Sequence, residues 1–366
     1  MQTTETNPAV VEESMKMTDS LWRRYLPWGL VLLLILLGLA FWQPLIAWIA
    51  AASWNVWLGA LAQGLGFGAV AMGVYLTFRI LNFPDLTIDA SFPMGAAVAA
   101  ALILRGNNPY LTLPLAFLAG ALAGVATGLI HTRFKINGLL ASILVLTGAF
   151  TVNLRIMGQA NIPLLNAETI FSPFQPFFRQ LFLEQWDRAW VRVHANIMAI
   201  VIFLAVIILL KLVLDWFLRT ELGLAMRATG DNPQMIRALG VNTDQMKILA
   251  LALSNGLVGL SGALLAQYQG FADVNSGAGL IIAGLAAVII GETIFRPKTI
   301  AWATLAVVLG MIVYRVAIAL ALIIELPLPG FEKNFRLEAT DVKLATALLV
   351  LIALALPQIR RRRKMI

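Results

Sequence analysis

Long apolar stretches separated by short polar connections are the dominant pattern of this chain. Most of the stretches run for about 20 residues, the length that an α-helix needs to cross roughly 30 Å of hydrocarbon. We expect helices because lipid offers no partner to an unpaired backbone N–H or C=O group. The fold class predicted is an all-α integral membrane protein with about ten transmembrane helices. These spans are 26–50, 56–78, 88–104, 110–131, 138–157, 195–217, 247–268, 277–294, 300–324 and 340–357.

Composition agrees with this pattern and excludes a soluble domain. Hydrophobic residues make up 60% of the chain and charged residues 13%, whereas soluble domains have about 45–50% and 25%. Lysine and arginine are unevenly divided between the connections, with about 17 on the side of the N-terminus and about eight on the other. Both termini are therefore predicted to be cytoplasmic. The net charge of +8 then indicates contact with anionic membrane lipids and no nucleic-acid partner.

The membrane domain is predicted over residues 26–357, flanked by two polar ends. Residues 1–25 are expected to form a disordered cytoplasmic N-terminus, since residues 1–20 are acidic and lack a periodic apolar pattern. Residues 358–366 form a basic cytoplasmic tail, either an anchor at the membrane surface or a docking segment. Outside, residues 170–194 carry aromatic residues at helical spacing and predict an amphipathic segment. This segment either lies in the membrane interface or contacts an external partner.

Two polar breaks form a weak internal repeat. The segment NFPDLTIDAS follows the second span, and GFADVNSGAG follows the seventh. Because these two spans are predicted to run in opposite directions, the copies form an inverted repeat, which marks the substrate path in many transporters. At an offset of 188 residues the alignment places Phe83, Asp85 and Thr87 on Phe271, Asp273 and Asn275.

Polar residues at these breaks and near the outer end of span 138–157 are the candidates for a translocation path. Acidic groups at membrane depth are costly and usually functional, but an Asp or Thr can also simply cap the helix that follows it. Both interpretations are open for the acidic candidates. Arg315 lies deep in its span and is expected to have a partner that the sequence does not identify. The path candidates are Asn82, Asp85, Thr87, Asp89, Asn153, Arg155, Asp273 and Asn275.

Residues for catalysis or for holding a cofactor are absent from the sequence. The chain has no cysteine and only two histidines, which lie at predicted membrane boundaries on opposite sides, so a histidine metal site is not expected. The phosphate-binding pattern G-x-x-x-x-G-K-[ST] does not occur. The chain is therefore predicted to be no enzyme, and any ATP would be bound by a partner subunit.

A polar island at 219–247 interrupts the apolar pattern on the cytoplasmic side. Asp231 or Asn232 can N-cap a short helix there, Pro233 suits its first turn, and Gly240 suits its end. The predicted helix, about 233–239, is too short to be stable alone in water. It must be held by the spans or by a partner.

The segment RATGDNPQMIRALGVNTDQMKILALALSNGLVGLSGALLAQ resembles the coupling region of ABC importer permeases of the branched-chain amino acid and ribose type. The resemblance extends over roughly residues 55–357, and the nearest likeness is to the uncharacterised or aromatic-amino-acid permease branch. The first break departs from the residues usual in the family, so the substrate stays open. The matching positions are Arg227, Ala228, Gly230, Asn232, Ala238, Gly240, Val241, Lys247, Gly256, Gly259 and Gly262.

This resemblance implies a permease subunit in a bacterial inner or plasma membrane, carrying a small polar solute such as an amino acid. It implies two cytoplasmic ABC ATPases, a second and identical permease protomer, and an extracytoplasmic substrate-binding protein. The short helix would fit a groove on the ATPase. The coupling residues carried over are Arg227, Gly230, Asn232, Arg237, Ala238 and Gly240. The alternatives are an ABC exporter of the same fold, or a self-sufficient secondary transporter or channel with ion coupling through Asp85, Asp273 and Arg315.

Overall fold

The computed structural model describes residues 54–174 and 188–323, together with 325, 326, 335, 336, 344, 347 and 351. Residues Met1–Ala52 and Ser53–Ile366 are separate compact units, and only the second contains described residues. The predicted N-terminus 1–25, the span 26–50 and the tail 358–366 lie outside the described residues. So do residues 175–187 of the outer amphipathic segment, and nearly all of the span 340–357.

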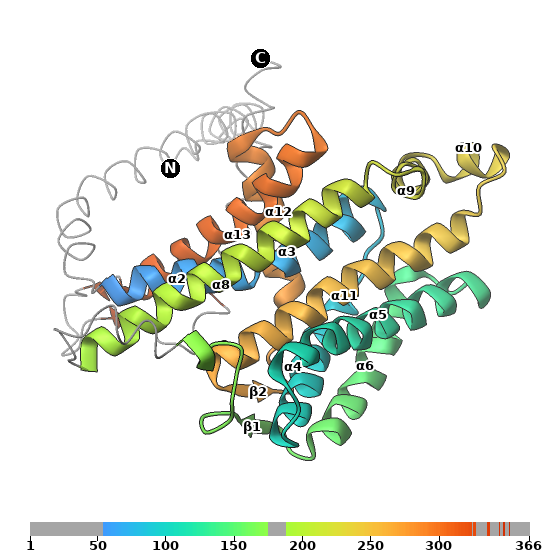
Figure 1. Ribbon diagram of the computed structural model, residues 1–366. Coiled ribbons are helices and arrows are strands. Elements are labelled where there is room, and N and C mark those ends of the chain that lie inside the picture. The colour runs from blue at the N-terminus through green and yellow to red at the C-terminus, as the bar shows by residue number, and fades with distance from the viewer. Residues whose placement is uncertain are drawn as a thin grey trace, which may run out of the picture. The chain divides into compact units, whose positions relative to one another are not determined.

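Helices make up nearly all of the described fold (Figure 1). In chain order they are α2 Trp54–Gly66, α3 Gly68–Val74, the π-helix η1 Tyr75–Ile80, α4 Ile88–Leu104, α5 Pro109–Arg133, α6 Gly138–Met157, the 3₁₀ turn η2 Ser172–Phe174, α8 Arg188–Phe217, α9 Glu221–Asp231, α10 Pro233–Ala238, α11 Thr243–Gln269, α12 Leu280–Phe295 and α13 Ile300–Ile323.

Six of the described helical segments are long and apolar enough to cross a membrane, and α4 and α12 are shorter apolar helices. The six are Trp54–Ile80, Pro109–Arg133, Gly138–Met157, Ala195–Phe217, Thr243–Gln269 and Ile300–Ile323. A helix therefore occupies each of the predicted spans between 56 and 324. The all-α membrane class agrees with the structure, while the count of about ten spans stays a prediction because the first and last lie outside the described residues.

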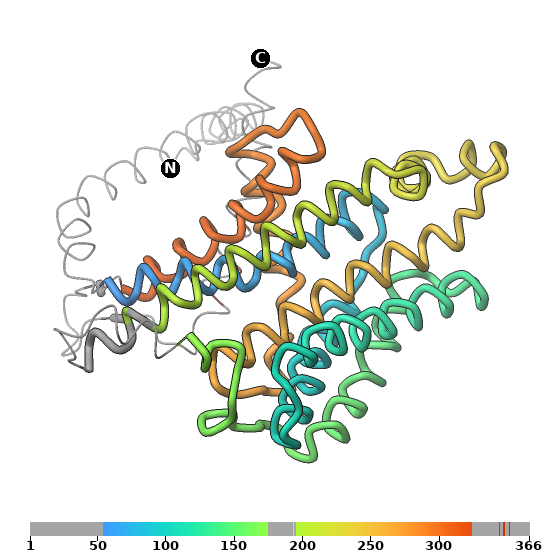
Figure 2. Tube along the Cα trace, viewed as in Figure 1, coloured from blue at the N-terminus to red at the C-terminus, as the bar shows by residue number. Residues whose placement is uncertain are grey.

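Helix α11 lies at the centre of the described fold and packs against both α4 and α5. Figure 2 shows α11 in yellow to orange beside the blue-green α4 and α5. Glycine allows this close packing: a Cβ atom added at Gly95 would lie 1.8 Å from the Gly259 carbonyl oxygen, and one at Gly120 would lie 2.2 Å from that of Asn255. The backbones of the three helices are therefore in direct contact, as small residues allow in membrane bundles.

Two small antiparallel ribbons complete the described structure. Strand β1, Asn161–Pro163, pairs with β2, Phe271–Asp273, in a register that places Asn161 opposite Asp273. This ribbon connects the segment after α6 with the segment after α11. Strand β3, Glu325–Leu326, pairs with β4, Phe335–Arg336.

Candidate functional site

The first polar break leads into a buried network between α4 and α11. Asp85 is completely buried; its Oδ2 accepts a hydrogen bond from Asn255 Nδ2 at 2.7 Å, and its Oδ1 accepts one from the Thr87 N–H at 2.9 Å. Ser91 Oγ donates to Asn255 Oδ1 at 2.6 Å. Thr87 and Thr127 share a hydrogen bond of 2.6 Å between their hydroxyl oxygens. The Asp85 side chain thus has partners for both oxygens, as a buried carboxylate requires, and does not reach the surface of this chain.

Asp89 connects the two short helices. Its Oδ2 accepts from the Gly279 N–H at 2.9 Å and its Oδ1 from the Ile281 N–H at 2.8 Å. It therefore caps α12, which is 190 residues away, and not the helix that follows the break. A Cβ atom at Gly277 would lie 1.8 Å from the Asp89 carbonyl oxygen, so the backbones also meet here. The structure thus brings the second break against the start of α4, although the inverted repeat itself stays a prediction.

The remaining path candidates are spread over the membrane domain. Asn153 is buried on α6 and donates from Nδ2 to the Ala90 carbonyl at 3.2 Å, while its Oδ1 has no hydrogen-bond partner within the described part of the chain. Arg155 and Asn82 are exposed, and Asn82 adopts a left-handed backbone conformation with φ of 53°. Asp273 accepts from the Asn275 N–H at 2.8 Å in the turn after β2. Among the described residues, hydrogen bonds join Asp85 with Thr87 and Asp273 with Asn275.

The Arg315 guanidinium packs on the face of an aromatic ring. The guanidinium carbon lies 3.7 Å from the centroid of the Phe67 ring, and Nη1 donates to Gln63 Oε1 at 3.5 Å. Phe67 in turn stacks on Phe92, with centroids 5.4 Å apart and an interplanar angle of 11°. The cation is thus stabilised by a ring face, while its Nε has no hydrogen-bond partner within the described residues.

An ion pair in α8 was missed by the sequence analysis. Lys211 Nζ bonds Asp215 Oδ2, and Asp215 Oδ1 accepts from Thr304 Oγ1 at 2.6 Å on α13. The signal was present, since a Lys and an Asp four residues apart face each other on a helix and charges inside an apolar span are rarely unpaired. The pair joins α8 to α13.

The polar island folds into α9 and α10. Asn232 Oδ1 accepts from the Met235 N–H at 3.0 Å and Pro233 occupies the first turn, so Asn232 is the N-cap among the two alternatives. Gly240 has φ of 88°, a left-handed conformation that suits glycine after a helix. Figure 1 shows α9 and α10 at one end of the long helices.

Two contacts attach the island to the membrane helices. A Cβ atom at Gly230 would lie 1.9 Å from the Ile80 carbonyl oxygen, so α9 touches the end of η1 by its backbone. Arg237 Nη2 donates to Thr243 Oγ1 at 2.6 Å and to Asp244 Oδ1 at 3.3 Å in the first turn of α11. Arg227 is half-buried and Ala238 is exposed. The short helix is therefore held by the chain itself, in agreement with its predicted need for support.

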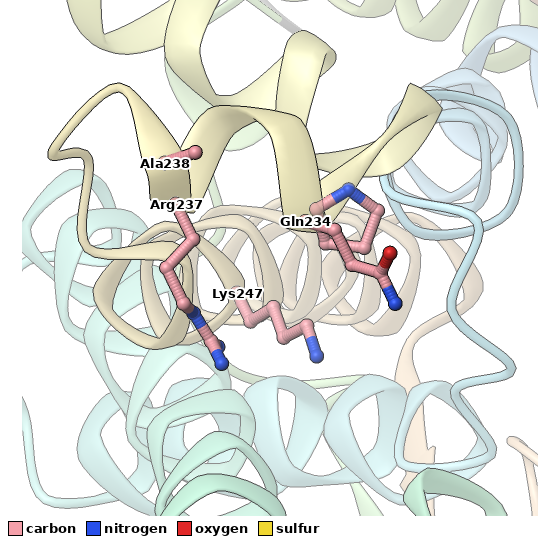
Figure 3. A pocket seen from close by; sticks show the side chains of 5 residues that line it. Gln234, Arg237, Ala238 and Lys247 are labelled. Carbon is pink, nitrogen blue, oxygen red and sulfur yellow. The ribbon is translucent and has the colours of Figure 1, made fainter.

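A pocket of about 470 Å³ lies between α10 and the first turns of α11, and we call it the α10 pocket. Figure 3 shows the Arg237 and Lys247 side chains extending from these two helices with their nitrogen atoms on the same side. Lys247 Nζ lies 3.3 Å from His131 Nε2. The lining residues are Pro233, Gln234, Arg237, Ala238 and Lys247.

Comparisons with known proteins agree with these features. The family model described as branched-chain amino acid transport system / permease component matches residues 56–355. A tyrosine transport system permease protein of Clostridioides difficile is 38% identical over 298 residues, which cover 81% of this chain and 90% of the relative. The uncharacterized protein RP368 of Rickettsia prowazekii is 35% identical over 66% of this chain and 78% of its own length. A probable branched-chain amino acid transport permease protein LivH of Methanocaldococcus jannaschii is 27% identical over 61% of this chain and 69% of its own length. This chain therefore belongs to the family of branched-chain amino acid transport system permease components, and it is a multi-pass membrane transport subunit rather than an enzyme.

Proposed function

We propose that this chain is the membrane-spanning subunit of an ATP-driven ABC importer and that its cargo is a small polar solute, with an amino acid as the favoured class. Its relatives include permeases named for tyrosine and for branched-chain amino acids. The single observation that carries the proposal is the capped polar pair α9 and α10, which stands outside the apolar helices and is attached to them by backbone contact.

The island is suited to pass a movement from a partner to the spans. Helix α10 has only six residues, yet its cap and the Arg237 bonds to α11 fix its position. Backbone contact at Gly230 then joins α9 to the span Trp54–Ile80. In this scheme Arg227 and Arg237 contact the ATPase, while Gly230, Asn232, Ala238 and Gly240 give the island its shape.

The polar candidates divide into two roles under this proposal. Asp85, Thr87, Asp89 and Asn153 are bonded between helices, which supports a role in holding the two breaks in place. The exposed candidates Asn82, Arg155 and Asn275 are available to a passing solute or to a partner at the ends of the path. Half-buried Asp273 lies beside Asn275.

The assembly proposed contains two cytoplasmic ABC ATPases that bind ATP, a second identical permease protomer and an extracytoplasmic substrate-binding protein. Its location is the bacterial inner or plasma membrane, with both termini in the cytoplasm. The chain itself holds no cofactor in this proposal.

The variant Ala238→Pro tests the coupling role. A proline inside a helix costs about 3 kcal/mol, which is enough to disrupt a helix as short as α10. We expect ATP-driven uptake to fall at least about tenfold, while the protein still inserts in the membrane. Tenfold is a lower bound, because a loss of about 3 kcal/mol acting entirely on coupling would lower uptake further. Ala238→Ser is the matched control because serine keeps the helix and adds one oxygen.

Uptake that is unaltered in Ala238→Pro contradicts the proposal. Transport by the purified chain alone down an ion gradient would instead establish a secondary transporter, and ATP-driven efflux of the solute would establish an exporter.

A further inference from the structure

We propose that the α10 pocket receives a carboxylate side chain of the cytoplasmic ATPase, held between Arg237 and Lys247. This inference rests on the proposed function and adds to it the chemistry of one contact. Arg237 and Lys247 are the charged residues that line the pocket, and neither Asp nor Glu lines it. The pocket is therefore cationic and complementary to an acidic side chain.

The Asp244 carboxylate beside the pocket is already shared between two cations. Asp244 accepts from Arg237 through Oδ1 at 3.3 Å and from Lys135 through Oδ2 at 3.2 Å. A single negative charge thus faces two cations there. Lys247 has no ion pair within the described ranges, and its ammonium contacts a histidine nitrogen instead. The charge of Lys247 is left for a partner to balance.

The position of the Lys247 ammonium is fixed by His131. His131 Nδ1 lies 2.8 Å from the Ile136 carbonyl oxygen, and since a carbonyl only accepts, Nδ1 carries the proton and Nε2 accepts from Lys247. The Phe83 ring packs edge-on against the imidazole with centroids 5.1 Å apart. An ammonium has three N–H donors, so a single bond to His131 leaves two for an incoming carboxylate. The site is thereby oriented before the partner arrives, which lowers the entropic cost of binding.

Apolar side chains beside the pocket favour a protein as the occupant. Met235 lies on α10 and Leu239 is the residue that ends it, and they are 57% and 69% exposed. Exposed apolar anchors next to a charged pocket are typical of a protein interface, where apolar contacts form the centre and charged groups set the register. An anionic lipid headgroup is the competing source of an oxyanion and is separated by the experiment.

Carbodiimide crosslinking tests the contact directly in the full complex. The permease is reconstituted with its cognate ATPase and treated with a carbodiimide. The reagent activates a carboxyl group, the Lys247 amine attacks it, an amide bond forms, and the carbodiimide leaves as a urea carrying the carboxyl oxygen. We expect mass spectrometry to find Lys247 joined to an Asp or Glu of the ATPase.

Three variants sharpen the result. Lys247→Arg keeps the charge but has no primary amine, so the complex still forms and the crosslink disappears. Lys247→Gln removes the charge and should weaken ATPase binding about tenfold. This is less than the loss for truncating a fully buried interfacial ion pair, because the neighbouring Arg237 side chain is 64% exposed and solvent screens the charges. Lys298→Gln is the control, because Lys298 is another cytoplasmic lysine by the predicted topology, is exposed, and lies outside the pocket. It leaves both the affinity and the Lys247 crosslink in place.

The outcomes separate this inference from the proposed function. An active complex that gives no Lys247 crosslink, and whose affinity is unchanged in Lys247→Gln, overturns the pocket assignment and leaves the importer intact. Failure of the wild-type chain to bind any ABC ATPase overturns both. Weaker binding of phosphatidylglycerol vesicles by Lys247→Gln, with unchanged ATPase affinity, shows a lipid headgroup in the pocket and also overturns the inference.

Discussion

Replacing Asp89 with alanine removes both acceptors from the N-terminus of α12. This helix has no cap of its own, because the residue before it is Gly279, which has a φ of 82° and no side chain to accept a bond. Loss of an N-cap costs about 0.5–2 kcal/mol, and a buried donor left without a partner costs about 1–3 kcal/mol. Ile281 is buried, whereas Gly279 is exposed and its N–H can bond water. We therefore expect the free energy of unfolding to fall by about 3 kcal/mol, from the lost cap and one unpaired buried donor.

The variant Asp89→Asn shows whether the lost stability comes from the lost charge or from the lost acceptors. Asp89→Asn keeps one oxygen and therefore one of the two bonds, so we expect about half the loss, roughly 1.5 kcal/mol. The assay is unfolding of the purified protein in mild detergent by denaturant titration, followed by helical circular dichroism. Glu168→Ala is the matched control, since Glu168 is exposed and surface substitutions stay within about 0.5 kcal/mol. An Asp89→Ala midpoint equal to that of the wild type would refute the reasoning. Equal losses in the alanine and asparagine variants would show that charge, and not the number of acceptors, is responsible.

Three further variants test other contacts. Gly95→Val should abolish the folded protein, because its Cβ would lie 1.8 Å from the Gly259 carbonyl oxygen and moving the two helices apart would cost packing energy. The measurement is the yield of monodisperse protein after extraction, and a normal yield contradicts the packing argument. Asn232→Ala should cost about 1 kcal/mol and speed hydrogen exchange in α10, with unchanged exchange as the contrary result. Arg79→Gln should change the free energy of unfolding by less than about 1 kcal/mol, and by less still in high salt, because the Arg79 and Glu292 side chains are 64% and 30% exposed. A larger loss that does not depend on salt would show that this ion pair stabilises the fold more than an exposed pair can.

Some helix ends were readable from the sequence because local chemistry determines them, although α11 begins at Thr243 and not at the predicted residue 247. Span 138–157 coincides with α6, where Asn137 caps the first turn by accepting from the Leu139 N–H and Gly158 ends the helix in a left-handed conformation. The short helix of the polar island was predicted from a cap, a proline and a glycine within nine residues. Each of these signals acts within one or two turns of the chain.

Partners across the bundle could not be predicted, because they depend on how helices pack. The Asp85 contact to Asn255 spans 170 residues, and the Asp89 contact to Ile281 spans 192. The sequence showed that these carboxylates lie at helix breaks, yet a single sequence does not say which distant N–H or amide faces them. Arg315 is similar, since its partner is the face of an aromatic ring and the chain has 19 phenylalanines.

The central place of α11 has a consequence for biosynthesis. Ribosomes deliver the chain from its N-terminus, and domains form in that order during synthesis. Helices α4 and α5 thus enter the membrane long before α11, whose backbone fills the space above Gly95 and Gly120 and whose Asn255 pairs with Asp85. Until α11 is inserted, the Asp85 carboxylate lacks that amide partner and the glycine faces lack a neighbour. A nascent or truncated chain that ends before residue 243 should therefore hold a carboxylate and two glycine faces in the bilayer without the partners that α11 supplies.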